Sequence, residues 1–281
     1  MTFRIRFAKY GVVKFIGHLD VMRYFQKVVR RSELPVKYSQ GFNPHQLLTF
    51  AQPLGVGITS DGEYMEIEFD DDRMLKLANV EAIGTRDIGN GLTVLLTADK
   101  DAPKLEKLVF DELSRETYEG FSIVAVKLLP PPKANTKVEK AMALVSGADY
   151  MVSLKDGYSL GFESPEAFEE AFIRFASQKE ITVTKKTKKN ENEINIRQYI
   201  YAAGGAESFD TTVGTVHADA YESGQRVFMR LAAGSIVNIR PELLMEAFCE
   251  SIGKEYASNM FQVHRLETYM GNVGHFKSML G

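Results

Sequence analysis

The chain has 281 residues, of which 44% are hydrophobic and 25% are charged, and its formal net charge is −3. These values are typical of a folded globular protein and exclude disorder over the whole length. A single cysteine, Cys249, excludes a disulfide framework and a zinc or iron–sulfur site built from this chain's own thiolates. No apolar run approaches the roughly 20 residues of a membrane-spanning helix, and residues 1–7 alternate like a strand, so we expect a cytoplasmic protein.

The charge is unevenly distributed along the chain. Residues 1–60 hold nine basic and two acidic side chains, a net charge of +7, so the remainder carries −10. A basic segment on an acidic body indicates a directed electrostatic surface. Its partner is nucleic acid, an acidic protein surface or the acidic part of the same chain, and the charge alone leaves these open.

The first half of the chain predicts a β-α-β-β-α-β pattern if residues 71–100 are an insertion. Alternating apolar residues indicate a strand over 2–9, and apolar residues at helical spacing indicate a helix over 18–33 that Pro35 ends. A loop over 38–44 follows, then two strands that turn at Asp61-Gly62. The later predicted elements are a short helix over 71–80, a strand over 92–97, a helix over 102–118 and a strand over 121–129.

The second half repeats this order of elements if the lysine-tipped hairpin over 181–197 is counted as an insertion. The prediction comprises a strand over 149–155, a helix over 165–178, a hairpin over 181–197, a second hairpin over 213–231, a helix opened by Pro241 and ended by Gly253, and a strand over 261–266. We therefore predict an α+β protein with two tandem ferredoxin-like domains that carry insertions. The predicted boundaries are 1–129 for the N-terminal domain with its basic helix, 130–147 for a proline-rich linker, 148–270 for the C-terminal domain and 271–281 for a tail.

A stripe of basic residues is the strongest chemical feature of the sequence. Arg23, Lys27, Arg30 and Arg31 gather on one face of the predicted helix because residues three and four apart are neighbours. Guanidinium groups suit contact with phosphate. The alternative is a solvated face partly paired with Asp20 and Glu33.

The loop that follows has the composition of a recognition loop for single-stranded RNA. Its aromatic and imidazole rings would stack bases, its amides would read base edges, and its glycine would permit close backbone approach. The alternative is a structural turn whose aromatic side chains fill the core. The candidate residues are Tyr38, Gln40, Gly41, Phe42, Asn43 and His45.

Further candidates are weaker. Lys185 and Lys186 belong to a lysine-rich hairpin tip with Lys188 and Lys189, which either contacts RNA or deters edge pairing. Arg197 and Arg240 each end an Asn-Ile-Arg triplet, and either bind an anion or take part in helix capping. His18 and His45 are weak candidates for a general acid or base, or for a shared metal. The alternative is that His18 and Asp20 lie in the first turn of the helix, where a carboxylate suits the helix dipole. We expect no metal and no cofactor, since no motif for either is present.

Arg4 and Arg6 point away from the predicted helices, onto the same open face of the sheet as Glu66 and Glu68. We expect cross-strand ion pairs between them, which would keep this face from being strongly basic.

Several motifs resemble the radical SAM-associated (radical SAM-linked) protein family, a bacterial family of unknown function. The resemblance rests first on residues 14–20 (Lys-Phe-Ile-Gly-His-Leu-Asp) and 38–45 (Tyr-Ser-Gln-Gly-Phe-Asn-Pro-His). Gly17 stands where the family usually has serine, and Asn195 where it often has aspartate. Shorter matches continue through residues 54–56, 62–64, 140–142, 148–150, 194–197 and 238–241.

The resemblance implies a radical SAM partner protein and hints at RNA, because members are encoded beside or fused to radical SAM proteins and often near ribonuclease genes. It supplies no catalytic residues. The predicted fold is also similar to RNA-binding CRISPR-associated endoribonucleases of the repeat-associated group, at the level of fold only. Our leading expectation is a non-catalytic accessory protein that binds RNA for a radical SAM enzyme. The alternatives are a metal-independent endoribonuclease and a protein–protein adaptor.

Overall fold

The computed structural model describes the chain except for residues 90–91, 134–135, 137–138 and 187–190. It divides into two compact units. The first unit comprises Met1–Val56, Glu63–Leu144 and Met279–Gly281, and the second comprises Gly57–Gly62 and Val145–Ser278. The predicted linker, 130–147, spans the point at which the chain passes from the first unit to the second, whereas Gly57–Gly62 belongs to the second unit although the first surrounds it in sequence.

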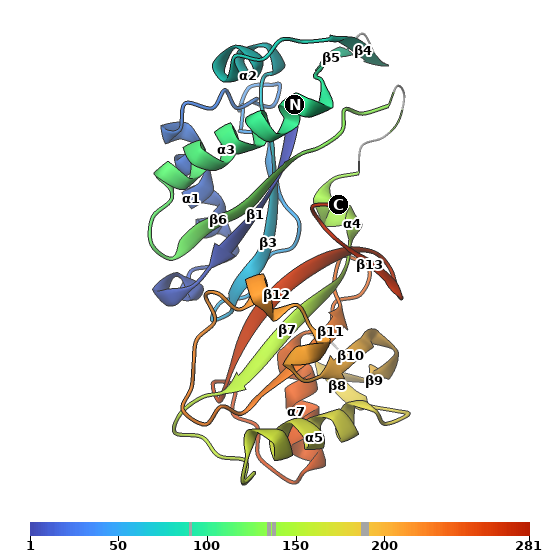
Figure 1. The fold of residues 1–281 in the computed structure, drawn as a ribbon. Helices are drawn as coiled ribbons and strands as arrows, with labels where there is room; N and C mark the ends of the chain where they lie inside the picture. Colours follow the sequence, from blue (N-terminus) through green and yellow to red (C-terminus); the bar gives the residue numbers. More distant parts are fainter. Residues whose placement is uncertain (90–91, 134–135, 137–138, 187–190) are drawn as a thin grey trace. The chain divides into compact units, whose positions relative to one another are not determined.

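The first unit is a sheet with α1 and α3 on one face (Figure 1). Its strands lie in the order β2-β3-β1-β6, and β1 pairs antiparallel with β6. The main elements are β1 (Thr2–Lys9), α1 (His18–Arg31), β2 (Leu48–Phe50), β3 (Thr59–Glu68, of which residues 63–68 belong here), α3 (Ala102–Glu116) and β6 (Phe121–Leu128). The smaller elements are a 3-10 helix (Gly11–Phe15), α2 (Asp71–Ala78), the hairpin of β4 (Gly84–Gly89) and β5 (Leu92–Leu96), and α4 (Ala141–Leu144).

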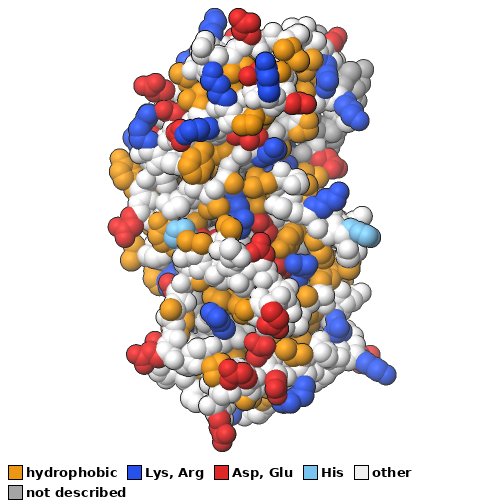
Figure 2. Space-filling view, in the orientation of Figure 1, with side chains coloured by type: hydrophobic (Ala, Val, Ile, Leu, Met, Phe, Trp, Pro, Cys, Tyr) orange, Lys and Arg blue, Asp and Glu red, His pale blue; other side chains and the backbone are white. Residues whose placement is uncertain are grey.

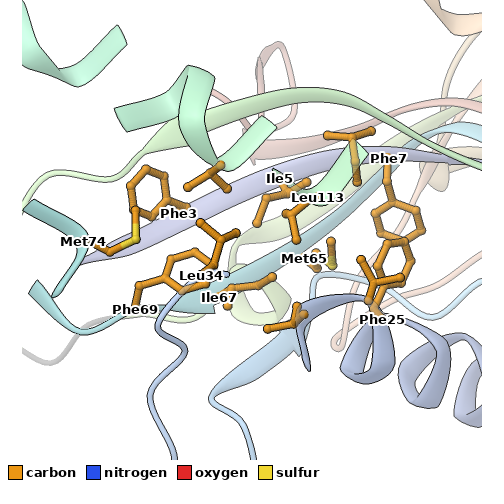
Figure 3. Close-up of a cluster of buried hydrophobic side chains, with 14 of the residues drawn as sticks. Phe3, Ile5, Phe7, Phe25, Leu34, Met65, Ile67, Phe69, Met74 and Leu113 are labelled. Atoms are coloured by element: carbon orange, nitrogen blue, oxygen red, sulfur yellow. The ribbon is translucent and has the colours of Figure 1, made fainter. Parts of the chain in front are cut away.

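The core of this unit follows directly from the sequence pattern. In β1, Phe3, Ile5 and Phe7 alternate onto one face and are buried, as Figure 3 shows. In α1, the apolar residues at helical spacing are buried against them, and the rings of Phe25 and Phe7 meet edge to face with centroids 4.7 Å apart. Burying these faces fixes which side of α1 remains in water.

The second unit has a sheet in the order β10-β11-β7-β12. The short hairpin strand β13 and the Thr59–Ser60 segment of β3 also pair with β12, the latter in parallel. Phe168 and Phe172 pack with Phe248 between α5 and α7. The elements are β7 (Val145–Leu154), α5 (Pro165–Ala176), β8 (Thr182–Lys186), β9 (Glu191–Asn195), β10 (Ile200–Gly204), α6 (Thr211–Gly214), β11 (Arg226–Ala232), α7 (Pro241–Ser251), β12 (Phe261–Asn272) and β13 (His275–Ser278). The chain is therefore an α+β protein with a mixed sheet.

Two predicted elements are wrong. Asp61-Gly62 is not a turn but lies inside β3, where Gly62 contributes its carbonyl to the Thr268 hydroxyl. Residues 213–220 alternate like a strand but do not form one, because the Asp210 side chain caps α6 and the Asp61 carboxylate takes the backbone N–H of His217. The strands that pair with β11 are β10 and β7.

Candidate nucleic-acid interface

The basic stripe (Arg23, Lys27, Arg30 and Arg31) lies on the exposed face of α1. Arg23 pairs with Asp20 at 3.1 Å, one turn away, and both side chains remain exposed. Arg31 pairs with Glu116 at 3.1 Å and lies over the Tyr118 ring. Lys27 and Arg30 make no ion pair with any residue that the structure describes, so these two cations are available to a ligand.

The recognition loop (residues 38–45) lies beside this helix. The Gln46 amide donates to the Gln26 carbonyl of α1 at 3.3 Å, and Ser39 and His45 close the loop through their backbones. At its tip Gly41 has φ +112°, and the neighbouring Phe42 is 105% exposed. Phe42 therefore does not fill the core. Tyr38 is 47% exposed, and Gln40, Asn43 and His45 are exposed as well.

Exposed apolar side chains continue the same surface toward the start of α1. Val12 and Phe15 lie in the 3-10 helix, and Leu19 follows in the first turn of α1, one turn before Arg23. They are 82%, 65% and 61% exposed, and the Lys14 ammonium lies 5.4 Å from the centre of the Phe15 ring. The sequence analysis missed these residues. The sequence pattern that could have identified them is three large apolar residues spaced three and four positions apart, on the side opposite the buried face of the helix.

A polar cluster lies buried under the start of α1. Lys9, His18, Gln52 and Glu63 line a cavity of about 10 Å³ with apolar neighbours such as Phe50, whose ring His18 meets edge-on at 5.1 Å. We call these four residues the buried polar centre. Lys9 is 1% and Glu63 3% exposed, and the Lys9 ammonium donates to the carbonyls of Lys14 and Ile16 at 3.2 and 3.0 Å.

Burial sets the protonation of this centre. It lowers the pKa of Lys9, with Glu63 acting in the opposite sense. Burial also lowers the pKa of His18, while Glu63 raises it and Lys9 lowers it further. The imidazole is therefore neutral at pH 7, since its pKa lies below the ordinary 6.5. Sequence reasoning identified His18 but missed Lys9, whose signal is a lysine continuing the apolar face of β1.

The structure does not bring His18 and His45 together. The Nδ1 atom of His45 and the Ser39 hydroxyl are joined by a hydrogen bond of 2.8 Å, and the loop attaches to α1 near Gln26. That attachment lies eight residues from His18, about 12 Å along a helix. Among the described residues no group of histidine, cysteine, aspartate and glutamate is arranged to hold a metal ion.

The candidate residues of the second unit have different surroundings. Lys185 and Lys186 end β8, and the lysines at 188 and 189 lie outside the described residues. Arg197 donates to the carbonyls of Gln178 and Ile200 at 3.1 and 2.9 Å. Arg240 is exposed at the start of α7 and lines a cavity of about 340 Å³ with apolar side chains and Glu246.

Two further sets of ion pairs stabilise the fold. Arg4 pairs with Glu66 at 2.7 Å on the first unit's sheet, as predicted, and Glu68 pairs with Lys140 at 2.5 Å. In the second unit the buried Asp61 carboxylate accepts from the His217 ring at 2.5 Å and its backbone N–H at 3.0 Å, and His264 lies at 3.3 Å. Burial opposes ionisation of Asp61, but these hydrogen bonds prevail and lower its pKa.

The face of the molecule seen in Figure 2 carries basic, acidic and apolar side chains intermingled, without a broad area of one charge sign. None of the described helices has the length and apolar character needed to cross a membrane.

Fold and site together define an α+β protein of two compact units, the first with a basic helix beside an exposed aromatic loop. The model of one protein family matches residues 2–109 and 74–241, which together span most of the chain. The chain therefore belongs to that family, which is described as "Uncharacterized protein conserved in bacteria (DUF2344)". No curated protein matches the chain significantly.

Proposed function

We propose that the chain binds RNA through the basic stripe and the recognition loop, and that it serves as an accessory protein to a radical SAM enzyme. One observation carries the RNA proposal. Lys27 and Arg30, which have no ion-pair partner within the described part of the chain, lie beside a loop whose Phe42 is 105% exposed.

The physical chemistry of this arrangement suits a single-stranded region within an RNA. Basic side chains along α1 would hold successive phosphates, which supplies affinity without sequence choice. Phe42, and Tyr38 at the base of the loop, would stack bases. Stacking on an aromatic ring is worth about 1–3 kcal/mol per base. The exposed amides of Gln40 and Asn43 would then read or position base edges.

The fold also supports the proposal, at the level of architecture alone. We interpret both units as ferredoxin-like with insertions. Each has the element order β-α-β-β-α-β once α2 and the β4–β5 hairpin are set aside in the first unit, and the β8–β9 hairpin and α6 in the second, and each places its first and third major strands next to each other. This interpretation underlies the similarity to repeat-associated CRISPR endoribonucleases, and fold alone does not fix function. The radical SAM partner rests on the sequence resemblance.

A protein–protein adaptor is the second candidate, and the exposed Val12, Phe15 and Leu19 favour it. An acidic partner with apolar side chains would fit the same end of α1. This alternative predicts complexes from cell extracts that survive ribonuclease treatment and do not form in a variant with both Arg23→Glu and Arg30→Glu.

The RNA proposal is tested by charge reversal on the stripe. The Lys27→Glu, Arg30→Glu variant is expected to bind RNA recovered from native cells at least tenfold more weakly. The slope of log affinity against log salt should also fall by about two, one for each phosphate that the variant no longer neutralises. Filter binding at several salt concentrations measures both.

The matched control is Lys179→Glu, Lys277→Glu, which reverses two exposed lysines of the second unit and should leave binding and slope unchanged. Unchanged RNA affinity after reversal of all four stripe residues would place the site elsewhere.

A further inference from the structure

A cavity of about 340 Å³ lies in the second unit, between the β8–β9 hairpin and the start of α7. The hairpin strand β8 packs beside α7 (Figure 1). The residues that line the cavity include none from the basic stripe or the recognition loop. Its volume lies at the lower end of the range for small-molecule sites, about 300–1,000 Å³. The space is therefore large enough for a small organic molecule.

One wall of the cavity is apolar. Ile194 of β9 contributes to it, together with Ile239 and Leu243 around the start of α7. Ile239 is buried, and the other two are half-buried. Such a wall favours a ligand with an apolar body, because contact removes apolar surface from water.

Two side chains of opposite charge line the same cavity. Arg240 is the N-cap residue of α7, and its side chain makes no capping hydrogen bond. Glu246 lies six residues further along the helix, about 9 Å along the axis. In the parts of the chain that the structure describes, neither side chain makes a hydrogen bond or an ion pair, with the other or with any third residue. The cavity therefore offers one position for an anion and a second for a cation.

The two ends of a ligand would meet different surroundings. A guanidinium group suits a carboxylate, with which it forms paired hydrogen bonds. The start of α7 also favours negative charge near Arg240, because its first N–H groups have no side-chain cap. An ammonium group would then lie against the Glu246 carboxylate, and the apolar body between the two ends would cover the isoleucine and leucine side chains.

We propose that this cavity binds a small zwitterion with an apolar body, of the size of an apolar dipeptide. An extended chain spans at most about 3.3–3.6 Å per residue, so a dipeptide holds its amine and carboxylate roughly 7 Å apart. That separation is within reach of the Arg240 and Glu246 side chains, whose backbone positions are about 9 Å apart along the helix axis. The inference goes beyond RNA binding and uses other residues.

The experiment titrates the full-length protein with three peptides in a calorimeter: leucyl-leucine, N-acetyl-leucyl-leucine and leucyl-leucine amide. The second lacks the positive charge and the third lacks the negative charge. Wild type should bind leucyl-leucine with a Kd below about 1 mM, and each blocked peptide at least tenfold more weakly, since one charged contact is lost.

Variants of the two charged residues test which end meets which side chain. Arg240→Met should bind leucyl-leucine at least tenfold more weakly and should no longer distinguish it from the amide. Glu246→Gln should show the same loss and should no longer distinguish leucyl-leucine from the acetylated peptide. A structural disturbance alone would weaken all three peptides alike and keep both distinctions. The matched controls Arg174→Met and Glu250→Gln change exposed residues outside the cavity and should bind like wild type.

A Kd above about 1 mM for leucyl-leucine and wild type would overturn the inference. Equal binding of the three peptides by wild type would also overturn it, because the two charges would then make no contribution. Either result would leave the proposed RNA binding standing, since the basic stripe and the recognition loop take no part in this cavity.

Discussion

At the scale of single residues, burial and hydrogen-bond partners decide which polar groups have a shifted pKa. Lys9 and Asp61 are both about 1% exposed, yet their environments act in different ways. Lys9 is held by two carbonyls and its charge is disfavoured, whereas Asp61 is held by two histidines and its charge is favoured. Neither could be recognised from the sequence, because a lone lysine or aspartate in a strand does not reveal its partners.

Asp61 should make the stability of the second unit depend on pH in a defined direction. Because the folded-state pKa lies below the unfolded value of 3.8, its contribution is present above that pH and is lost as pH falls through the folded pKa. Asp61→Asn is expected to cost about 3 kcal/mol at pH 7, as for other buried partners removed singly, and the cost should shrink below pH 4. Chemical unfolding of both proteins at pH 7 and pH 3 measures this. An equal cost at the two pH values would contradict it.

At the scale of elements, the strands and helices with strong periodicity were predictable from sequence. The predictions for β1, α1, α3, α5 and α7 are confirmed to within a few residues. The stripe was predictable because it needs only helical spacing. The predicted turn at Asp61-Gly62 and the predicted strand over 213–220 were wrong because distant contacts, to Thr268 and to Asp61, override local preference.

Gly62 illustrates such a distant constraint and gives a second stability prediction. A Cβ added there would lie 2.5 Å from the Glu267 Cα and 2.7 Å from the Leu266 carbonyl, and these backbone atoms of β12 cannot move aside easily. Gly62→Ala should therefore destabilise the protein by about 1–3 kcal/mol, as overpacking does. The control is Gly84→Ala, where nothing lies within 4 Å. Thermal unfolding compares them, and equal melting temperatures would refute the argument.

At the scale of the whole molecule, the two units are not successive lengths of chain. Residues 57–62 lie in the sequence of the first unit but belong to the second, where Thr59 and Ser60 pair with His264 and Arg265. The Pro130–Pro132 stretch was the reason for predicting a linker over 130–147, and the chain passes between the units near its end, at Leu144 and Val145. The proline stretch could not indicate that residues 57–62 belong to the second unit, because these six residues have no distinctive sequence pattern.

A fragment of residues 145–278 should therefore be incomplete. It lacks the strand segment that pairs with β12 and the carboxylate that His217 and His264 contact. We expect its amides in β12 to exchange with solvent at least tenfold faster than in the full chain, and supplying residues 1–144 as a separate polypeptide should slow them again. Hydrogen exchange measures this. Full protection in the fragment alone would show that residues 57–62 are dispensable.

The membership of residues 57–62 in the second unit also matters while the ribosome is still making the protein. Thr59 leaves the ribosome 205 residues before His264, its hydrogen-bonding partner. At about 5–20 residues per second, this wait lasts roughly 10–40 s. Throughout that time the first half of the chain is present while one short stretch of it has no partner strand. Thr59, Ser60 and Asp61 in this stretch are polar, so the unpaired segment has a low tendency to aggregate in the nascent chain. The composition of the stretch therefore suits a segment that pairs with its partner strand late.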